Sequence, residues 1–204
     1  AIKDGNFVEK NVSFFIDSTA PRISKTEPRS DLTNGNFYVE FTEDNPKSLI
    51  LTYGNSFRNK SFDLSNCFED RRRTTCEEFV SLSEFEGKEI QYWFTLEDIA
   101  NNSDTSRPVA VEVDQTAPII NKLNYTIDRR RVRFNINITE KNFDRVEFMD
   151  NAESRPRWRL LCTNLREDIC ERTFSFGTGL HNLSFNVTDE AGNYASRENI
   201  GFTI

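Results

Sequence analysis

Methionine, histidine and tryptophan are scarce in this 204-residue sequence, which contains one, one and two of them, and it has no long apolar run. A helix that spans a membrane needs about 18 consecutive, mostly apolar residues, and no segment approaches that length. The first residues also lack the basic and apolar segments of a signal peptide. We therefore expect no membrane contact within this segment of chain.

Basic charge is also scarce, because 33 acidic residues outnumber 26 basic ones and give a net charge of −7. A nucleic-acid-binding protein needs a basic face to neutralise phosphates, so no nucleic-acid partner is expected. Two local basic runs occur, at Arg71–Arg73 and Arg129–Arg131, and each has acidic neighbours. We interpret both as solvated turns, with an anionic polysaccharide or a phosphate surface as the alternative partner.

Catalytic motifs are absent: the sequence has no G-x-S-x-G, no H-E-x-x-H, no glycine-rich phosphate loop and no cysteine–histidine arrangement. His181 begins the inward phase of a predicted strand, which favours a packing or edge role over that of a catalytic base. Trp93 has the outward phase of its strand, and Trp158 is flanked by arginines. We expect sheet-surface packing for both rather than stacking on sugar, including a cation–π contact for Trp158. The chain is thus predicted not to be an enzyme.

An internal repeat is the main positive feature of the sequence. The motif D-x-T-A-P occurs at Asp17–Pro21 and again, 97 residues later, at Asp114–Pro118. Further landmarks recur in the same order, since Glu43, Asn45, Cys67, Cys76, Asp98 and Asn102 correspond to Glu140, Asn142, Cys162, Cys170, Asp189 and Asn193. A chain built twice from one unit of about 90 residues is a tandem array. We predict two domains, module one at residues 17–113 and module two at residues 114–204.

Hydrophobic alternation with a period of two predicts strands throughout both modules. In module two, one face of a strand is formed by Val132, Phe134, Ile136 and Ile138. In module one the predicted strands are residues 22–27, 36–42, 48–53, 61–66, 76–82, 88–97 and 107–113. About seven short strands per module, separated by turn signals, predict an all-β chain of two tandem immunoglobulin-like β-sandwiches.

Three of the motifs carry a family resemblance. The D-x-T-A-P opening, the T-E-x-N after the second strand and the D-x-A-G-N of Asp189–Asn193 resemble the tandem immunoglobulin-like repeats of bacterial and archaeal cell-surface proteins. The resemblance covers nearly the whole chain and implies a stalk in an adhesin, a surface layer or a secreted enzyme. Module one departs from the pattern with Ala100-Asn101-Asn102 in place of A-G-N, and the local cysteine pair is unusual for the family.

The four cysteines form one pair in each module, Cys67 with Cys76 and Cys162 with Cys170. A metal site would need histidine or further cysteine nearby, and the spacings do not match zinc ligands. We therefore predict two local disulfides, each contributing about 2.5–3 kcal/mol by the loop-entropy relation. Because disulfides persist in oxidising compartments, we expect an extracellular or cell-surface location.

Seven N-x-Ser/Thr sequons point to the same location. The predicted glycosylation sites are Asn11, Asn59, Asn101, Asn124, Asn137, Asn182 and Asn186. The last three occupy the polar phase of predicted strands, where a glycan would face water.

Residues 1–16 reproduce the end of a module without its sandwich, with Val12, Phe14 and Ile16 in alternation. We predict a lone β-strand, either the last strand of a preceding module or a donor strand that pairs with a sheet edge of another subunit. The expected partners are therefore neighbouring modules or subunits through sheet edges, and a glycan or a cell-surface protein.

Strand direction predicts a cation site in each module. In a seven-strand sandwich the first strand starts at the pole where the second-to-third and sixth-to-seventh loops lie, so acidic residues of these segments converge. The two sets are Asp17, Glu43 and Asp98 in module one, and Asp114, Glu140 and Asp189 in module two. Three carboxylates repel one another unless a cation bridges them, and calcium prefers oxygen ligands. Calcium at the module junctions is the candidate cofactor, and turn capping by the same side chains is the alternative.

Three functions fit these features. A stalk or spacer in a cell-surface protein is favoured by the repeat, the cysteine pairs and the sequons. A self-assembling filament or surface-layer subunit would use residues 1–16 for strand donation. A glycan- or protein-binding accessory module of a secreted enzyme is the third.

Overall fold

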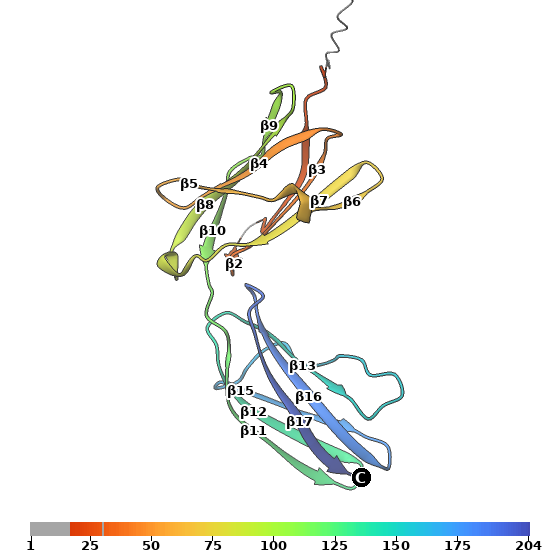
Figure 1. The fold of residues 1–204 in the computed structure, drawn as a ribbon. Helices are drawn as coiled ribbons and strands as arrows, with labels where there is room; N and C mark the ends of the chain where they lie inside the picture. Colours follow the sequence, from red (N-terminus) through yellow and green to blue (C-terminus); the bar gives the residue numbers. More distant parts are fainter. Residues whose placement is uncertain (1–16, 30) are drawn as a thin grey trace, which may run out of the picture. The chain divides into compact units, whose positions relative to one another are not determined.

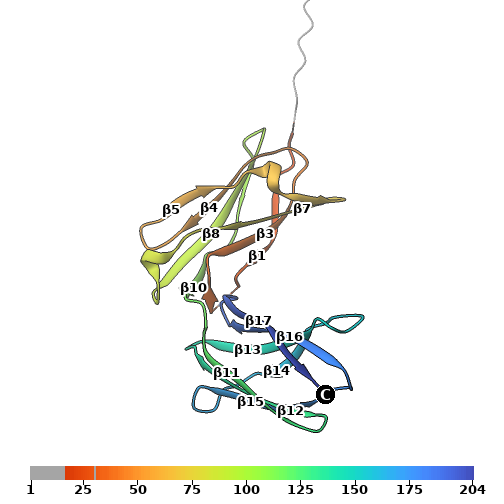
Figure 2. The same ribbon diagram turned by 60° about the horizontal axis from the view of Figure 1, so that its bottom comes forward.

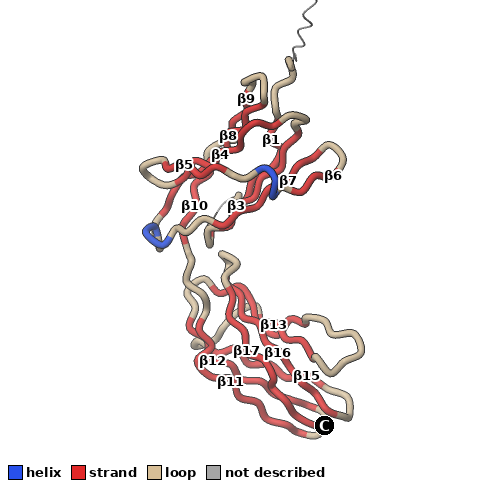
Figure 3. The backbone as a smooth tube through the Cα atoms, viewed as in Figure 1, coloured by secondary structure: helices blue, strands red, loops and turns tan. Residues whose placement is uncertain are grey.

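The computed structural model describes residues 17–29 and 31–204, so the strand predicted within residues 1–16 lies outside the described part of the chain. The described residues form β-strands and two short 3-10 turns, Leu64–Asn66 and Ser83–Phe85 (Figure 3). Within this part of the chain no helix has the length and hydropathy that a membrane span requires.

The described residues of module one contain ten strands, seven of which have four or more residues. They are β1 (Arg22–Glu27), β2 (Leu32–Thr33), β3 (Asn36–Thr42), β4 (Pro46–Tyr53), β5 (Arg58–Ser61), β6 (Phe68–Asp70), β7 (Arg73–Phe79), β8 (Glu89–Asp98), β9 (Ser103–Thr105) and β10 (Val109–Val113). One sheet has the order β1-β3-β7-β6 (Figure 1). The other has the order β2-β10-β8-β4-β5, with β9 paired to β8.

Module two contains seven strands. They are β11 (Ile119–Asp128), β12 (Arg131–Thr139), β13 (Phe143–Asp150), β14 (Arg159–Cys162), β15 (Ile169–Ser175), β16 (Leu180–Asp189) and β17 (Tyr194–Thr203). One sheet has the order β11-β12-β15 and the other β14-β13-β16-β17 (Figure 2). The fold class is therefore the predicted one, an all-β chain of immunoglobulin-like sandwiches.

The alternating apolar residues form the core of each sandwich. In β12 the predicted inward face is fully buried, and the ring of Phe134 lies 5.2 Å from that of Phe185 and 6.1 Å from that of Phe148. Because β12 belongs to one sheet and Phe148 and Phe185 to the other, these aromatic contacts hold the two sheets together. In module one the inward residues of β3 and β8 are buried in the same way.

One predicted strand of module one, residues 61–66, is wrong. β5 ends at Ser61, and the 3-10 turn Leu64–Asn66 follows. The Asp63 carboxylate accepts hydrogen bonds from the backbone N–H of Ser65 at 3.0 Å and from its hydroxyl at 2.7 Å. Such a short side chain stabilises a turn in competition with the sheet ladder. The short strands β2, β6 and β9 were not predicted.

The four cysteines form disulfides within the modules, Cys67 with Cys76 and Cys162 with Cys170, with Cα atoms 4.5 and 5.9 Å apart. This is the pairing that the spacing predicts. Cys162 ends β14 and Cys170 lies in β15, which are edge strands of different sheets. The second disulfide therefore joins the two sheets of module two.

Candidate functional site

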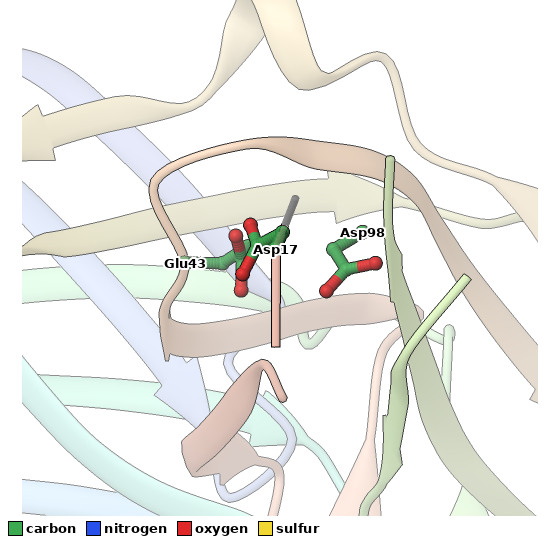
Figure 4. Close-up of side chains that lie close together, drawn as sticks. All are labelled: Asp17, Glu43 and Asp98. Carbon is green, nitrogen blue, oxygen red and sulfur yellow. The ribbon is translucent and has the colours of Figure 1, made fainter. Parts of the chain in front are cut away.

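Three acidic side chains of module one converge in space. Asp17 precedes β1, Glu43 follows β3, and Asp98 is the last residue of β8. One oxygen of each carboxylate lies within 4.8 Å of the other two, and Asp98 is buried (Figure 4). We call this group the first acidic cluster.

Module two repeats the arrangement with Asp114, Glu140 and Asp189, whose carboxylate oxygens also lie within 4.8 Å of one another. Asp114 and Asp189 are buried, with 6% and 1% of their surface exposed. We call this group the second acidic cluster. The structure thus brings together both sets of residues that strand direction predicts for a cation site.

Four of the six carboxylates cap the turn that follows them, each by accepting a hydrogen bond from the backbone N–H two residues later. The pairs are Asp17 with Thr19, Glu43 with Asn45, Asp114 with Thr116 and Glu140 with Asn142, at 2.8–3.1 Å. These are turns in which a side-chain oxygen replaces a backbone acceptor. The recurring D-x-T and E-x-N motifs therefore have a structural role in both modules.

The acidic residue that ends β8 holds a longer turn. Asp98 accepts hydrogen bonds from the backbone N–H of Ala100 and Asn102 and from Asn102 Nδ2, each at 2.8 Å. Asn102 Nδ2 also donates to the backbone oxygen of Asp17 at 3.3 Å. Burial acts to raise the pKa of Asp98, but the hydrogen bonds outweigh it and hold that pKa below its usual value. The hydrogen bonds expected of turn capping are thus present in the first acidic cluster.

The second acidic cluster shares the asparagine bonds of the first, but Asp114 also accepts from Asn142 Nδ2 at 2.6 Å, and the charge balance differs. Asn193 donates to Asp189 through its backbone N–H and its Nδ2, both at 2.8 Å, and Nδ2 also donates to the backbone oxygen of Asp114 at 2.8 Å. Burial raises the pKa of Asp189, and the charge of Asp114 raises it further. Burial also raises the pKa of Glu140, with added contributions from Asp189 and Asp114. Glu140 and Asp189 therefore resist ionisation in this cluster.

Asn101 explains how module one tolerates its departure from the A-G-N pattern. It occupies the turn position that Gly192 occupies in module two, and their φ angles are 67° and 90°. Both angles lie in the left-handed region, which glycine adopts freely and asparagine adopts more readily than most other residues. The same turn therefore forms from two different sequences.

His181 makes an ion pair that the sequence did not reveal. Its Nδ1 lies 2.5 Å from Oδ2 of Asp150, which ends β13, and its Nε2 lies 3.0 Å from the backbone oxygen of Gly177. Burial acts to lower the pKa of His181, but the bonds to these two acceptors outweigh it and favour the protonated imidazolium, which donates from both nitrogens. Rings of Phe176 and Phe202 lie 5.0 and 5.2 Å from it. His181 thus packs in the sandwich, as predicted, but as one half of a charged pair.

The two tryptophans differ from each other in their surroundings. Trp93 is half-buried and its ring lies 5.1 Å from that of Phe57, which agrees with sheet-surface packing. Trp158 is 46% exposed, and its neighbour Arg159 lies over the ring of Phe148 at 5.9 Å. The basic side chain beside Trp158 therefore uses a different aromatic partner from the expected one.

The predicted glycosylation sites fall into two groups, apart from Asn11, which lies outside the described residues. The exposed sites are Asn59, Asn101 and Asn124, and the half-buried ones are Asn137, Asn182 and Asn186. The side-chain oxygens of Asn137 and Asn186 accept hydrogen bonds from Asn121 and Ser196, at 2.9 and 3.2 Å. These bonds do not use Nδ2, the atom to which a glycan is attached.

No protein-family model and no curated protein matches the sequence. Among solved structures, the chain is similar to the FN1–FN3 domains of chicken CNTN1, with a TM-score of 0.56 and 9% identity over 91% of this chain and 67% of that chain. It also matches the fibronectin(III)-like modules of Clostridium thermocellum CbhA, with a TM-score of 0.45 and 10% identity over 90% of this chain and 93% of that chain. At such identity the first similarity establishes a fold of the fibronectin-III and immunoglobulin-like kind.

Proposed function

We propose that the chain is a non-catalytic structural segment of a cell-surface protein and that its tandem modules act as a stalk or spacer. Two sandwiches built on the same landmark residues support this role, because repeated modules extend a protein by a fixed unit. Disulfides in both modules support an extracellular location. The repeats of bacterial and archaeal surface proteins are the family that the motifs resemble.

The observation that carries this proposal is the recurrence of the acidic cluster in both modules. Each cluster joins the start of a module to two of its loops, and each would hold one calcium ion through carboxylate oxygens. Burial raises the pKa of Glu140 and Asp189, and in the second acidic cluster a divalent cation would offset the charge repulsion that adds to this effect. A cation held by three separate segments would stiffen that end of the module, as a stalk requires.

The mechanical role is tested by stretching the whole chain between flexible handles in a force microscope. In calcium, each module should unfold at a higher force than in chelator, because bound cations stabilise only the folded state. Variant Glu140→Gln/Asp189→Asn should lose the calcium effect in one of the two unfolding events and keep it in the other. Equal unfolding forces in calcium and chelator for the unaltered chain would contradict a cation-stiffened stalk.

Glycosylation belongs to the same proposal. The exposed sequons at Asn59, Asn101 and Asn124 are the sites where a glycan would need no rearrangement. Intact-mass and peptide mass spectrometry of protein from its native source should find sugar at one or more of these three. Unmodified asparagine at all three would remove glycosylation from the account but would leave the stalk in place.

A self-assembling filament is the second candidate, and it is favoured by β11. This edge strand has ten residues, and Ile119 and Ile127 expose 56% and 44% of their surface on it. A long exposed edge accepts a further strand, and residues 1–16 are the candidate donor. Deletion of residues 1–13 should then abolish assembly seen by sedimentation and electron microscopy. Unchanged sedimentation would exclude strand donation.

A further inference from the structure

Module two carries a tight hairpin between its two cysteines. Arg166 and Ile169 exchange two backbone hydrogen bonds, at 3.0 and 2.9 Å, across a turn of two residues. The turn residues Glu167 and Asp168 have φ angles of 51° and 61°. Each side chain in the left-handed region costs about 1 kcal/mol relative to glycine, and Cys162–Cys170 closes the base of the hairpin. The disulfide therefore fixes the position of a turn whose backbone conformation is energetically unfavourable.

Beside this hairpin lies a groove of about 540 Å³, formed by the edge strands β14 and β15 and the segment that connects them. Its polar groups include Arg166, Arg172, Thr163 and Asn164, and its apolar groups include Leu160, which is 51% exposed. We call it the arginine groove. It belongs to module two alone and contains no member of an acidic cluster.

The charge of the arginine groove is positive although the chain is acidic. Arg166 and Arg172 are exposed, and neither has an ion pair within residues 17–29 and 31–204. The acidic residue of the groove, Glu171, already accepts from Arg133 at 2.6 Å and from Asn135 at 3.3 Å. Hydrogen bonding to Arg133 lowers the pKa of Glu171. The negative charge of Glu171 is therefore balanced by Arg133, which lies outside the groove. Two guanidinium groups are left to face an incoming anion.

Module one has a related hairpin at the same place in the repeat. Cys67 precedes β6 and Cys76 lies within β7, and these two strands form a hairpin whose turn contains Arg71, with a φ angle of 59°, and Arg72 (Figure 3). Both arginines are exposed, and the neighbouring Phe68 exposes 70% of its surface. The two hairpins differ in sequence and length, yet each combines a disulfide, an exposed apolar side chain and arginines that form no ion pair with any residue the structure describes.

We propose that these disulfide-anchored hairpins bind an anionic polysaccharide. Planar guanidinium groups bind carboxylate or sulfate through paired hydrogen bonds, and Leu160 or Phe68 offers an apolar surface to a sugar ring. A polymer with regularly repeated charges suits a chain that repeats its basic hairpin, since two linked contacts strengthen each other. This inference is independent of cation binding by the acidic clusters.

The occupant favoured by the structure is a polysaccharide rather than an extended acidic peptide. Arg172 lies on the core-facing side of β15, in phase with Cys170 and Phe174. A charged residue that points inward on an edge strand opposes the addition of another strand. A peptide that bound by extending the sheet would meet this charge, whereas a glycan would use the same guanidinium as a ligand.

The test is calorimetric titration of the whole chain, in a chelating buffer of about 0.15 M ionic strength that silences the acidic clusters. The probes are polygalacturonate, dextran sulfate, uncharged dextran and polyglutamate. Binding is expected for the first two, and Arg166→Gln/Arg172→Gln should weaken it about tenfold. The matched control, Arg129→Gln/Arg130→Gln, makes the same charge change in an exposed turn outside the groove and should alter affinity by less than about twofold.

Three results would overturn the inference. Equal losses in both double variants would show general charge attraction rather than a site. Polyglutamate that binds as tightly as polygalacturonate, with the same dependence on Arg166 and Arg172, would identify an acidic protein as the partner. Absence of binding by both anionic polysaccharides would exclude the site altogether.

Discussion

Replacement of Asp150 by asparagine should destabilise module two in a pH-dependent way. The carboxylate is fully buried, and it binds the His181 ring, whose side chain is 12% exposed. Asp150 Oδ1 accepts hydrogen bonds from the backbone N–H groups of Ala152 and Asn182, at 3.1 and 3.2 Å. The side-chain oxygen of asparagine can accept the same two bonds. The variant therefore removes chiefly the charged bond to the imidazolium.

The size of the effect follows from the kind of bond lost. Hydrogen bonds to charged groups contribute about 1.5–3 kcal/mol, against about 0.5–1.5 kcal/mol for neutral ones. Asp150→Asn should thus lower the free energy of unfolding by about 2 kcal/mol at pH 5.5. For a module of about 90 residues that corresponds to a decrease of about 8–16 °C in the melting temperature of module two. The loss should be smaller at pH 8.5, because deprotonation of His181 as the pH rises removes the charge from this bond.

The direction of the pH dependence follows from the two pKa shifts. Burial acts to lower the pKa of His181, but the bonds to Asp150 and Gly177 outweigh it and raise that pKa above its unfolded value of about 6.5. Stabilisation by the pair is therefore fully present below about pH 6.5 and is lost as the pH rises through the folded pKa. Burial likewise acts to raise the pKa of Asp150, but hydrogen bonds from His181 and the backbone lower it. This contribution is present above about pH 3.9 and is lost as the pH falls through the folded pKa.

Urea denaturation at pH 5.5, 7.0 and 8.5 measures these differences. The chain has one histidine and its four cysteines are bonded, so few other groups titrate in this range. Asp128→Asn, an exposed residue at the end of β11, is the matched control and should leave stability unchanged within about 0.5 kcal/mol. A loss from Asp150→Asn that is equal at pH 5.5 and 8.5 would refute a charged His181.

Three further predictions concern the fold. Cys162→Ser/Cys170→Ser should lower the free energy of unfolding by about 2.5–3 kcal/mol in urea, and a loss below about 1 kcal/mol would show that the two sheets do not need this link. By the same measurement, Phe134→Ala should lower the free energy of unfolding by about 3–5 kcal/mol, because the side chain is fully buried. Phe68→Ala, at an exposed position, should lower it by less than about 0.5 kcal/mol. Similar losses for the two variants would contradict the described core. Asn101→Gly should leave the melting temperature unchanged, whereas Asn101→Ala should lower the free energy of unfolding by about 1 kcal/mol, because φ at this position is 67°. Equal melting temperatures for the two variants would argue against the left-handed turn.

Alternation with a period of two was sufficient to predict the long strands, because half-buried sheets impose it directly. The strands β1 and β3 occupy the predicted residues 22–27 and 36–42. The alternation predicted the wrong element where a side-chain hydrogen bond determined the backbone conformation, as at Asp63. Strands of two or three residues, such as β2 and β9, were missed because their neighbours rather than their own sequence select them.

The acidic clusters were predictable because strand direction alone places their members at one pole. The Asp150–His181 pair was not, because its partners are 31 residues apart and meet only through the register of β13 with β16. The arginine groove was missed for the same reason, since it depends on how far apart the edge strands β14 and β15 lie. The basic run at Arg71–Arg73 was interpreted as a solvated turn, and its relation to the disulfide became visible only in the hairpin.

The proposed function rests on the proposal that each acidic cluster holds a calcium ion. Calorimetric titration of calcium into chelator-treated protein tests it most directly, with melting temperature followed in parallel. We predict two ions bound per chain and a rise in melting temperature, and one ion per chain for the variant Glu140→Gln/Asp189→Asn. No heat and no shift in melting temperature for the unaltered chain would contradict the claim and leave these acids as caps of their own turns.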